Sequence, residues 1–241
     1  ITFKELNPIF DRALASYKLA MRKFPKSKFY DHALLKVASI FDEVGYNLEA
    51  RALYKQGLKS TPKSLYNEVR KNNLAAMLMK EGKLEEAFSA FQNILRKSRQ
   101  NIEAKAGIFE IANKFFEKKD LIRALKIFEA AVKRWPGELN EKPEINFAMA
   151  EIYYSQKKYV KARKHFFNLL NLDPSSKNSH KALNRIGDSY LLEGRYQNAL
   201  SVFDESGKRK SVKLDDQGRP VFDKEGNRVL EDSADTQYGK I

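Results

Sequence analysis

The sequence contains no cysteine, and it has only three histidines among its 241 residues. The lack of cysteine excludes disulfide bonds, a thiol nucleophile and every metal site with cysteine ligands. No apolar run approaches the roughly 20 residues that a membrane-spanning helix needs. Phosphate-binding loops of the GxGxxG or GxxxxGKS/T type do not occur either. These absences disfavour catalysis, and we predict a chain that is not an enzyme.

The three histidines do not form a metal site by their spacing. His32, His165 and His180 all stand more than four residues apart, whereas helical metal sites place two imidazoles three or four residues apart. His32 and His180 fall at the starts of predicted helices, where a surface or capping role is expected. We therefore predict no catalytic residue, no metal and no cofactor.

The charge balance is strongly basic, with a formal net charge of +14 at pH 7. Such an excess can indicate a nucleic-acid or membrane-surface partner. The lysines are scattered over the whole chain, however, which is typical of a solvated surface. The densest cluster, at 157–164, includes Arg163, and no aromatic residues alternate with basic ones as in single-strand-binding proteins. A basic surface that binds nucleic acid or another anionic polymer therefore stays an alternative.

What the chain does have is an internal repeat. An alanine followed four residues later by an aromatic residue recurs six times, at spacings of 37, 37, 37, 38 and 37 residues. In four of the six repeats a proline follows twelve residues after the alanine. The alanines are Ala13, Ala50, Ala87, Ala124, Ala162 and Ala199. So many positions in one register indicate a structural unit that is repeated along the chain.

Each repeat has the pattern of two short helices. In the last one, Ile186–Tyr190 is an apolar helix face, Gly194 is a natural helix stop, and Ala199–Phe203 forms a second helix face. Two short helices cannot bury their apolar sides alone, so each pair needs neighbours of the same kind. After a partial repeat at 10–24, helix pairs are predicted at 28–61, 65–98, 102–135, 141–173 and 178–206.

This pattern resembles the tetratricopeptide repeat, W-x2-L-G-x2-Y…A-x3-F…P with a period of 34 residues. The resemblance covers roughly Phe10 to Ser206, and the unit here is longer, similar to that of tetratricopeptide proteins of the bacterial cell envelope. It implies an all-α fold, a right-handed superhelical solenoid of helix pairs. Arg99 replaces a proline, and Lys119 and Lys157 replace glycines, so these departures affect the expected turn geometry but not the fold.

The resemblance also implies a concave face lined by the first helix of each pair, suited to an extended peptide or an amphipathic helix. The residues that this geometry places in a partner-binding groove are Asn72, Met79, Phe109, Asn113, Phe116, Phe147, Glu151, Tyr154 and Asn184. The aromatic members have an alternative role in packing between repeats, and the sequence leaves both roles open.

The periodicity changes after Ser206. Short alternating runs separated by glycine turns predict a small β-hairpin or meander at 207–232. Val221 and Phe222 are expected to pack against the last helices or a neighbouring molecule. Residues 233–241 resemble the start of a further first helix, so we expect the natural protein to continue beyond them. The predicted domains are thus a helical array at 1–206, the β insertion and this helix start.

Together these features predict a non-catalytic protein–protein interaction scaffold or adaptor that binds a partner peptide or helix. The resemblance implies a bacterial envelope-associated assembly and favours a periplasmic or outer-membrane-associated location over a cytoplasmic one, although the sequence itself does not give the location. Self-association stays open. A different functional class is a non-catalytic helical domain of a larger cell-wall or polysaccharide-processing enzyme.

Overall fold

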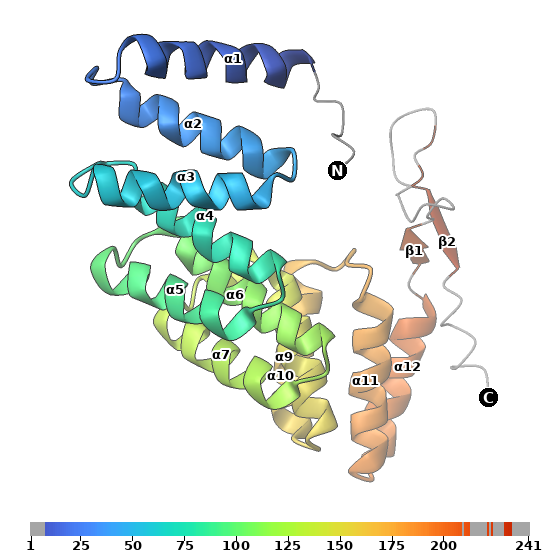
Figure 1. Cartoon of the computed structure of the whole chain (residues 1–241). Coiled ribbons are helices and arrows are strands. Elements are labelled where there is room, and N and C mark those ends of the chain that lie inside the picture. The colour runs from blue at the N-terminus through green and yellow to red at the C-terminus, as the bar shows by residue number, and fades with distance from the viewer. Residues whose placement is uncertain (1–7, 209, 213–220, 222, 224–228, 233–241) are drawn as a thin grey trace. The chain divides into compact units, whose positions relative to one another are not determined.

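A computed structural model describes residues 8–208, 210–212, 221, 223 and 229–232 of the chain (Figure 1). This part is almost entirely helical. Its helices are α1 (Pro8–Lys23), α2 (Tyr30–Glu43), α3 (Asn47–Ser60), α4 (Asn67–Lys80), α5 (Leu84–Lys97), α6 (Ile102–Glu117), α7 (Leu121–Arg134), α8 (Glu138–Glu141), α9 (Pro143–Ser155), α10 (Tyr159–Leu172), α11 (Ser179–Leu192) and α12 (Tyr196–Lys208). The five predicted helix pairs are therefore present, and none of the described helices is long and apolar enough to cross a membrane.

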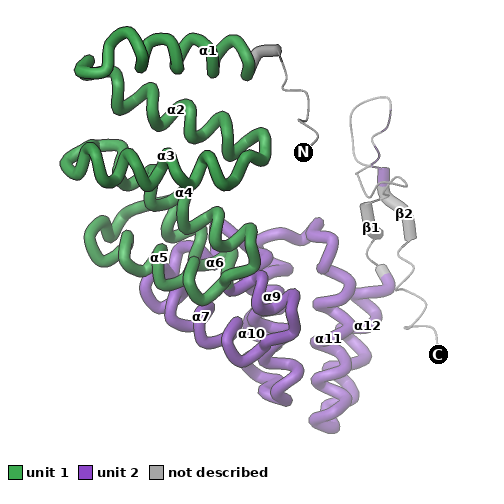
Figure 2. The backbone as a smooth tube through the Cα atoms, in the orientation of Figure 1, with its two compact units in different colours: residues 1–111 green, residues 112–241 purple. Residues whose placement is uncertain are grey.

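The helices belong to two compact units, residues 1–111 and residues 112–241 (Figure 2). The boundary falls inside α6. In the first unit α1 to α5 each pack against the next helix, and in the second unit α9 to α12 do the same, as expected for stacked pairs. The predicted domain border at residue 206 stays a prediction, since the residues after 208 are described only in part.

Most of the repeated alanines are buried in this packing. Five of the six are completely buried, with no exposed surface: Ala50, Ala87, Ala124, Ala162 and Ala199. Ala13, in the partial first repeat, is half-buried. A methyl side chain allows two helices to approach closely, and the aromatic residue one turn later then fills the space beside it. This burial is what the predicted register requires.

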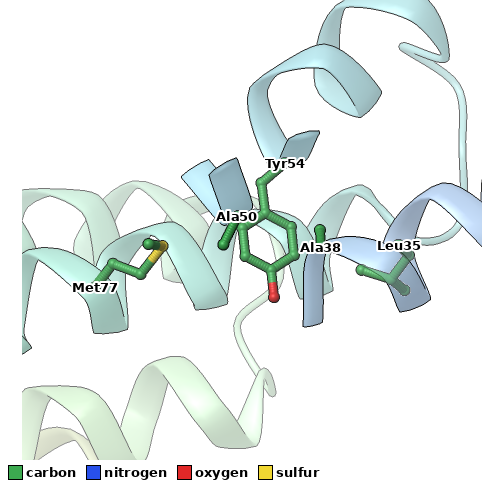
Figure 3. Packing of buried hydrophobic residues seen from close by; sticks show 5 residues of the cluster. All are labelled: Leu35, Ala38, Ala50, Tyr54 and Met77. Carbon is green, nitrogen blue, oxygen red and sulfur yellow. The ribbon is translucent and has the colours of Figure 1, made fainter. Parts of the chain in front are cut away.

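The core of the first unit shows how one pair holds the next. Tyr54 of α3 is fully buried and lies with Leu35 and Ala38 of α2 and with Met77 of α4 (Figure 3). The Tyr54 hydroxyl accepts a hydrogen bond from Asn73 Nδ2 at 2.8 Å. One aromatic side chain therefore contacts its own pair and the first helix of the next pair, as the stacking of repeats demands.

The turns inside the helix pairs share one backbone conformation. Gly45, Gly82 and Gly194 have φ values of 88°, 77° and 72°. Lys119 and Lys157, at the equivalent places, have φ values of 63° and 57°. The left-handed region favours glycine because a Cβ atom crowds the following carbonyl oxygen there. The turn geometry thus survives in all five pairs, and the two lysines are strained.

A polar network lies inside the first unit, between α2, α4 and the turn that precedes α4. The Arg70 guanidinium is fully buried and forms an ion pair with the Asp31 carboxylate. It also donates to Asn67 Oδ1 at 3.0 Å, while the Thr61 hydroxyl donates to Asp31 Oδ1 at 2.7 Å. Gly57 of α3 makes room, since a Cβ atom there would clash with the guanidinium. The network joins two successive repeats.

Beyond α12 the structure describes two short strands, β1 (Lys210–Val212) and β2 (Leu230–Asp232). They pair antiparallel with Ser211 opposite Glu231. Val221 is half-buried, and its carbonyl accepts from the Val229 N–H at 2.9 Å. Phe222 and residues 233–241 lie outside the described part, so the hairpin or meander and its packing contacts stay predictions.

Candidate functional site

The predicted groove residues of α9 meet α11 in the second unit, through a cluster of charges centred on Glu151. One Glu151 oxygen accepts from Arg185 Nε at 3.1 Å. The other oxygen pairs with Lys181 Nζ at 3.0 Å. Because one carboxylate engages two cations from the next first helix, the two helices are held in register at this point.

Aromatic rings lie under both cations. The Arg185 guanidinium carbon is 4.6 Å from the centre of the Tyr154 ring, and Lys181 Nζ is 5.3 Å from that of Phe147. The Tyr154 ring in turn meets the Tyr159 ring edge to face, with centroids 5.6 Å apart. Cations over aromatic faces are attracted by the ring quadrupole, so each ring position is fixed by a charge above it.

The same surface contains a further acidic group. Burial raises the pKa of Asp188 in α11, and the positive charge of Arg185 opposes that rise. Burial likewise raises the pKa of the Tyr154 hydroxyl, which therefore stays protonated at neutral pH and can donate a hydrogen bond. We name the surface formed by Glu151, Tyr154, Lys181, Arg185 and Asp188 the α9–α11 face. It offers both charge signs and an aromatic ring, which suits a polypeptide partner.

Four of the other predicted groove residues are buried in the helix packing. Phe147 is 9% exposed and packs edge to face on the Phe166 ring in α10. Phe109 is 2% exposed and Met79 is 7% exposed. Asn72 is buried, and its side-chain nitrogen donates to Asn101 Oδ1 at 3.1 Å. These side chains contribute to packing, the alternative role that the sequence left open.

The remaining three are partly accessible. Asn113 and Phe116 are half-buried in α6, with Lys119 Nζ 5.8 Å from the centre of the Phe116 ring. Asn184 is half-buried, but its side-chain oxygen accepts from the Ser206 hydroxyl of α12 at 3.1 Å. The structure thus brings Glu151, Tyr154 and Phe147 together and turns Asn184 toward its own pair. A single groove through all nine residues stays a prediction, since they belong to two units.

Sequence reasoning missed Lys181 and Arg185. The prediction selected equivalent positions in successive repeats, so Phe147 in one repeat corresponds to Asn184 in the next. Glu151 instead contacts residues 30 and 34 positions later. The available signal was a carboxylate in one first helix followed, about one and two turns short of a full repeat, by two cations on one face of the next.

The basic cluster at 157–164 is not wholly a solvated surface, so that interpretation was wrong for Arg163. This side chain is 6% exposed, pairs with Glu193 at 2.8 Å and donates to Ser189 Oγ at 2.9 Å. Its guanidinium also lies 4.3 Å from the centre of the Tyr190 ring. Arg163 therefore belongs to the α10–α11 packing, whereas the four lysines of the cluster, Lys157, Lys158, Lys161 and Lys164, are exposed.

The histidines differ in their burial, and only His180 departs from the surface position that was one of the roles expected for it. His180 is 6% exposed and therefore buried. His165 is half-buried, stacks on the Tyr153 ring and has Nδ1 3.0 Å from Asn146 Oδ1. Burial and the nearby charges of Lys164 and Lys161 lower the pKa of His165 to about 4. Within the described residues no three His, Asp or Glu side chains are grouped to hold a metal ion.

Comparison with known proteins identifies the repeat. Residues 109–179 match the sequence model of a family described as tetratricopeptide repeat. A tetratricopeptide repeat protein from Parabacteroides merdae has a similar structure, at 18% identity over 85% of this chain and 75% of that chain, with a TM-score of 0.52. The tetratricopeptide resemblance seen in the sequence is therefore confirmed at residues 109–179, and the chain shares the fold of tetratricopeptide repeat proteins.

Two further structures are similar at the level of the fold. YrrB, described as a tetratricopeptide repeat protein with an unusual peptide-binding site, is 15% identical over 80% of this chain and 91% of that chain, with a TM-score of 0.53. The pilF protein of Pseudomonas aeruginosa is 17% identical over 82% of each chain, with a TM-score of 0.53. No curated protein matches the sequence.

Proposed function

We propose that this chain is a non-catalytic interaction scaffold that binds a partner polypeptide on the α9–α11 face. The observation that carries the proposal is the fixed position of Arg185, whose Nε is held by Glu151 while its plane lies over Tyr154. A guanidinium and a ring that are already ordered lose little conformational entropy when a partner binds. Tyr and Arg are also the residue types that most often dominate binding energy at protein interfaces.

The chemistry of the face favours an extended peptide or one helix as the partner. The Tyr154 hydroxyl and the cations can donate hydrogen bonds to peptide carbonyls, while Glu151 and Asp188 can accept from peptide N–H groups. A peptide-binding site is also described for YrrB, which shares the fold. The unit of about 37 residues supports an envelope-associated, periplasmic or outer-membrane setting as part of the same proposal.

Selection from a random peptide library displayed on phage tests this function. The full chain is immobilised, and the double variant Tyr154→Ala/Arg185→Ala serves for counter-selection. We expect enriched peptides to bind the wild-type chain about tenfold or more tightly than the double variant, since a hot-spot residue contributes about 2 kcal/mol or more. Circular dichroism checks that the variant keeps its helices. Peptides that bind both proteins equally would place the interaction elsewhere.

A further inference from the structure

A cavity of about 320 Å³ opens between α4 and α5 in the first unit. Its apolar lining comes from Leu74, Ala75 and Leu78 of α4 and from Ala90 and Ile94 of α5. Ala75 and Ile94 are buried, whereas the two leucines and Ala90 are half-buried. We name this the α4–α5 groove. Its volume is at the lower end of the range of ligand pockets, about 300–1,000 Å³.

The repeat register explains why this pair of helices is hollow. Sixteen residues before the repeated alanine, the first helix of each other complete pair has a buried side chain. These residues are Leu34, Ile108, Asn146 and Leu183, with exposed fractions of 0%, 5%, 0% and 4%. The pair α4–α5 has Lys71 at this position, and Lys71 is exposed. The lysine extends to solvent and leaves the apolar space beneath it unfilled.

The rim of the groove is cationic. Lys71 and Lys97 both line it and are exposed. The acidic lining residue, Glu68, is held at one end by hydrogen bonds from Ser98 and from Asn101 Nδ2, and Lys71 lies close enough to interact with its charge. These contacts keep the carboxylate ionised, but the two lysines outnumber it, and the chain as a whole has a net charge of +14. An occupant with negative charges beside an apolar group complements this surface.

We propose that the α4–α5 groove is a second interaction site, in which an acidic protein segment inserts an apolar side chain into the space that Lys71 leaves unfilled. The site belongs to the first unit and is independent of the α9–α11 face. The inserted side chain takes the place of the buried residue that the other pairs supply from their own first helix. Acidic residues that flank it meet Lys71 and Lys97 at the rim.

Two synthetic helical peptides test the proposal. Both have leucines at positions i, i+3, i+4 and i+7, and the remaining positions are glutamate in one and lysine in the other. Fluorescence anisotropy with the full chain should show that the acidic peptide binds about tenfold or more tightly than the basic one, with an affinity that falls as salt rises. Lys71→Leu should weaken binding of the acidic peptide about tenfold or more, because the new side chain fills the groove.

Matched variants distinguish insertion into the groove from a general effect of charge or folding. Lys36→Leu makes the same substitution at an exposed position of α2, outside the groove, and should bind like wild type. Tyr154→Ala should also leave the affinity unchanged. Lys71→Leu should melt at a higher temperature than wild type, which excludes misfolding as the cause of lost binding. Absence of acidic-peptide binding, equal binding of both peptides, or equal loss in Lys71→Leu and Lys36→Leu would overturn the proposal.

Discussion

Arg70 in α4 and Asp31 in α2 form an ion pair across two successive repeats, 39 residues apart in the chain. The guanidinium has no solvent exposure. Its charge is compensated by the carboxylate, and the Asp31 backbone carbonyl accepts a further hydrogen bond from Arg70 at 3.0 Å. Desolvation makes an unpaired charge at such a place costly, so the pair fixes how the second repeat sits on the first.

Asp31→Asn should destabilise the chain strongly. The substitution leaves the Arg70 cation buried without its counter-charge, which costs about 3–5 kcal/mol of unfolding free energy. Arg70→Met removes the cation itself and should cost less, because Asp31 keeps the hydroxyl donors Ser64 and Thr61. Urea unfolding followed by circular dichroism measures both. An Arg70→Met loss that equals or exceeds the Asp31→Asn loss would show that packing, and not the unpaired charge, determines the effect.

Lys119→Gly and Lys157→Gly should each stabilise the chain by about 0.5–1 kcal/mol, since glycine adopts the left-handed conformation without the Cβ clash. The turn itself is regular, with the Asp120 N–H bonded to the Phe115 carbonyl at 2.9 Å. Gly45→Lys is the reverse control, because a Cβ atom there meets no atom within 4 Å and only the backbone conformation is tested. The melting temperature should rise for the first two variants and fall for the third.

Ala124→Leu and Ala162→Leu should each lower the unfolding free energy by about 1–3 kcal/mol, because overpacking a filled helix crossing forces side chains or backbone to shift. Both alanines have no exposed surface. Ala130→Leu, on the exposed side of α7, provides the matched control and should leave the melting temperature nearly unchanged. Unchanged melting temperatures for both buried variants would disprove the assigned register.

Stability should fall on acidification between pH 6.5 and pH 4, in part through His165. Its pKa is about 4 in the folded chain and 6.5 in the unfolded chain, so the unfolded state binds the proton first as the pH drops. The neutral ring therefore stabilises the fold above pH 6.5, and most of this contribution is lost by pH 4.5. His165→Gln should show a smaller difference in urea midpoint between pH 7.5 and pH 4.5. An identical difference in both proteins would contradict the assignment.

The protonation site of His165 follows from the neighbouring amide. Asn146 Nδ2 donates to the Leu139 carbonyl at 2.9 Å, which leaves Asn146 Oδ1 as the acceptor toward His165 Nδ1. The neutral ring must therefore carry its proton on Nδ1. Asn146→Leu should lower the pKa of His165 further, because the lost acceptor stabilises the cationic ring more strongly than the neutral one. A pH titration of the His165 ring signals by NMR measures this shift, and a rise in the pKa would contradict the assigned contact.

Most of the helical architecture was predictable from the sequence because it depends on apolar periodicity and on small residues at fixed spacing. The sequence alone is enough to assign Ala50 and Tyr54 to a helix crossing, since their pattern recurs in every repeat. The left-handed lysines could be located by register as well. These features depend on residues that are close together in the sequence, so the same residue types occur with the same backbone geometry in every repeat.

The polar contacts were not predictable in the same way. Arg70 and Asp31 each look like ordinary surface residues, and Arg163 stands in a run of lysines, yet both arginines are buried. The repeat fixes which helix face is inward, but the partner that a long side chain reaches depends on the offset between neighbouring helices. That offset is also why Arg185, and not Asn184, meets Glu151.

The most direct test of the central claim is hydrogen exchange of the full chain with and without a saturating peptide obtained from the library selection. We predict slower exchange in α9 and α11, at 147–154 and 181–188, and no such change in the Tyr154→Ala/Arg185→Ala variant. If the exchange rates of α9 and α11 stay unchanged while the peptide is bound, the α9–α11 face is not the partner-binding site.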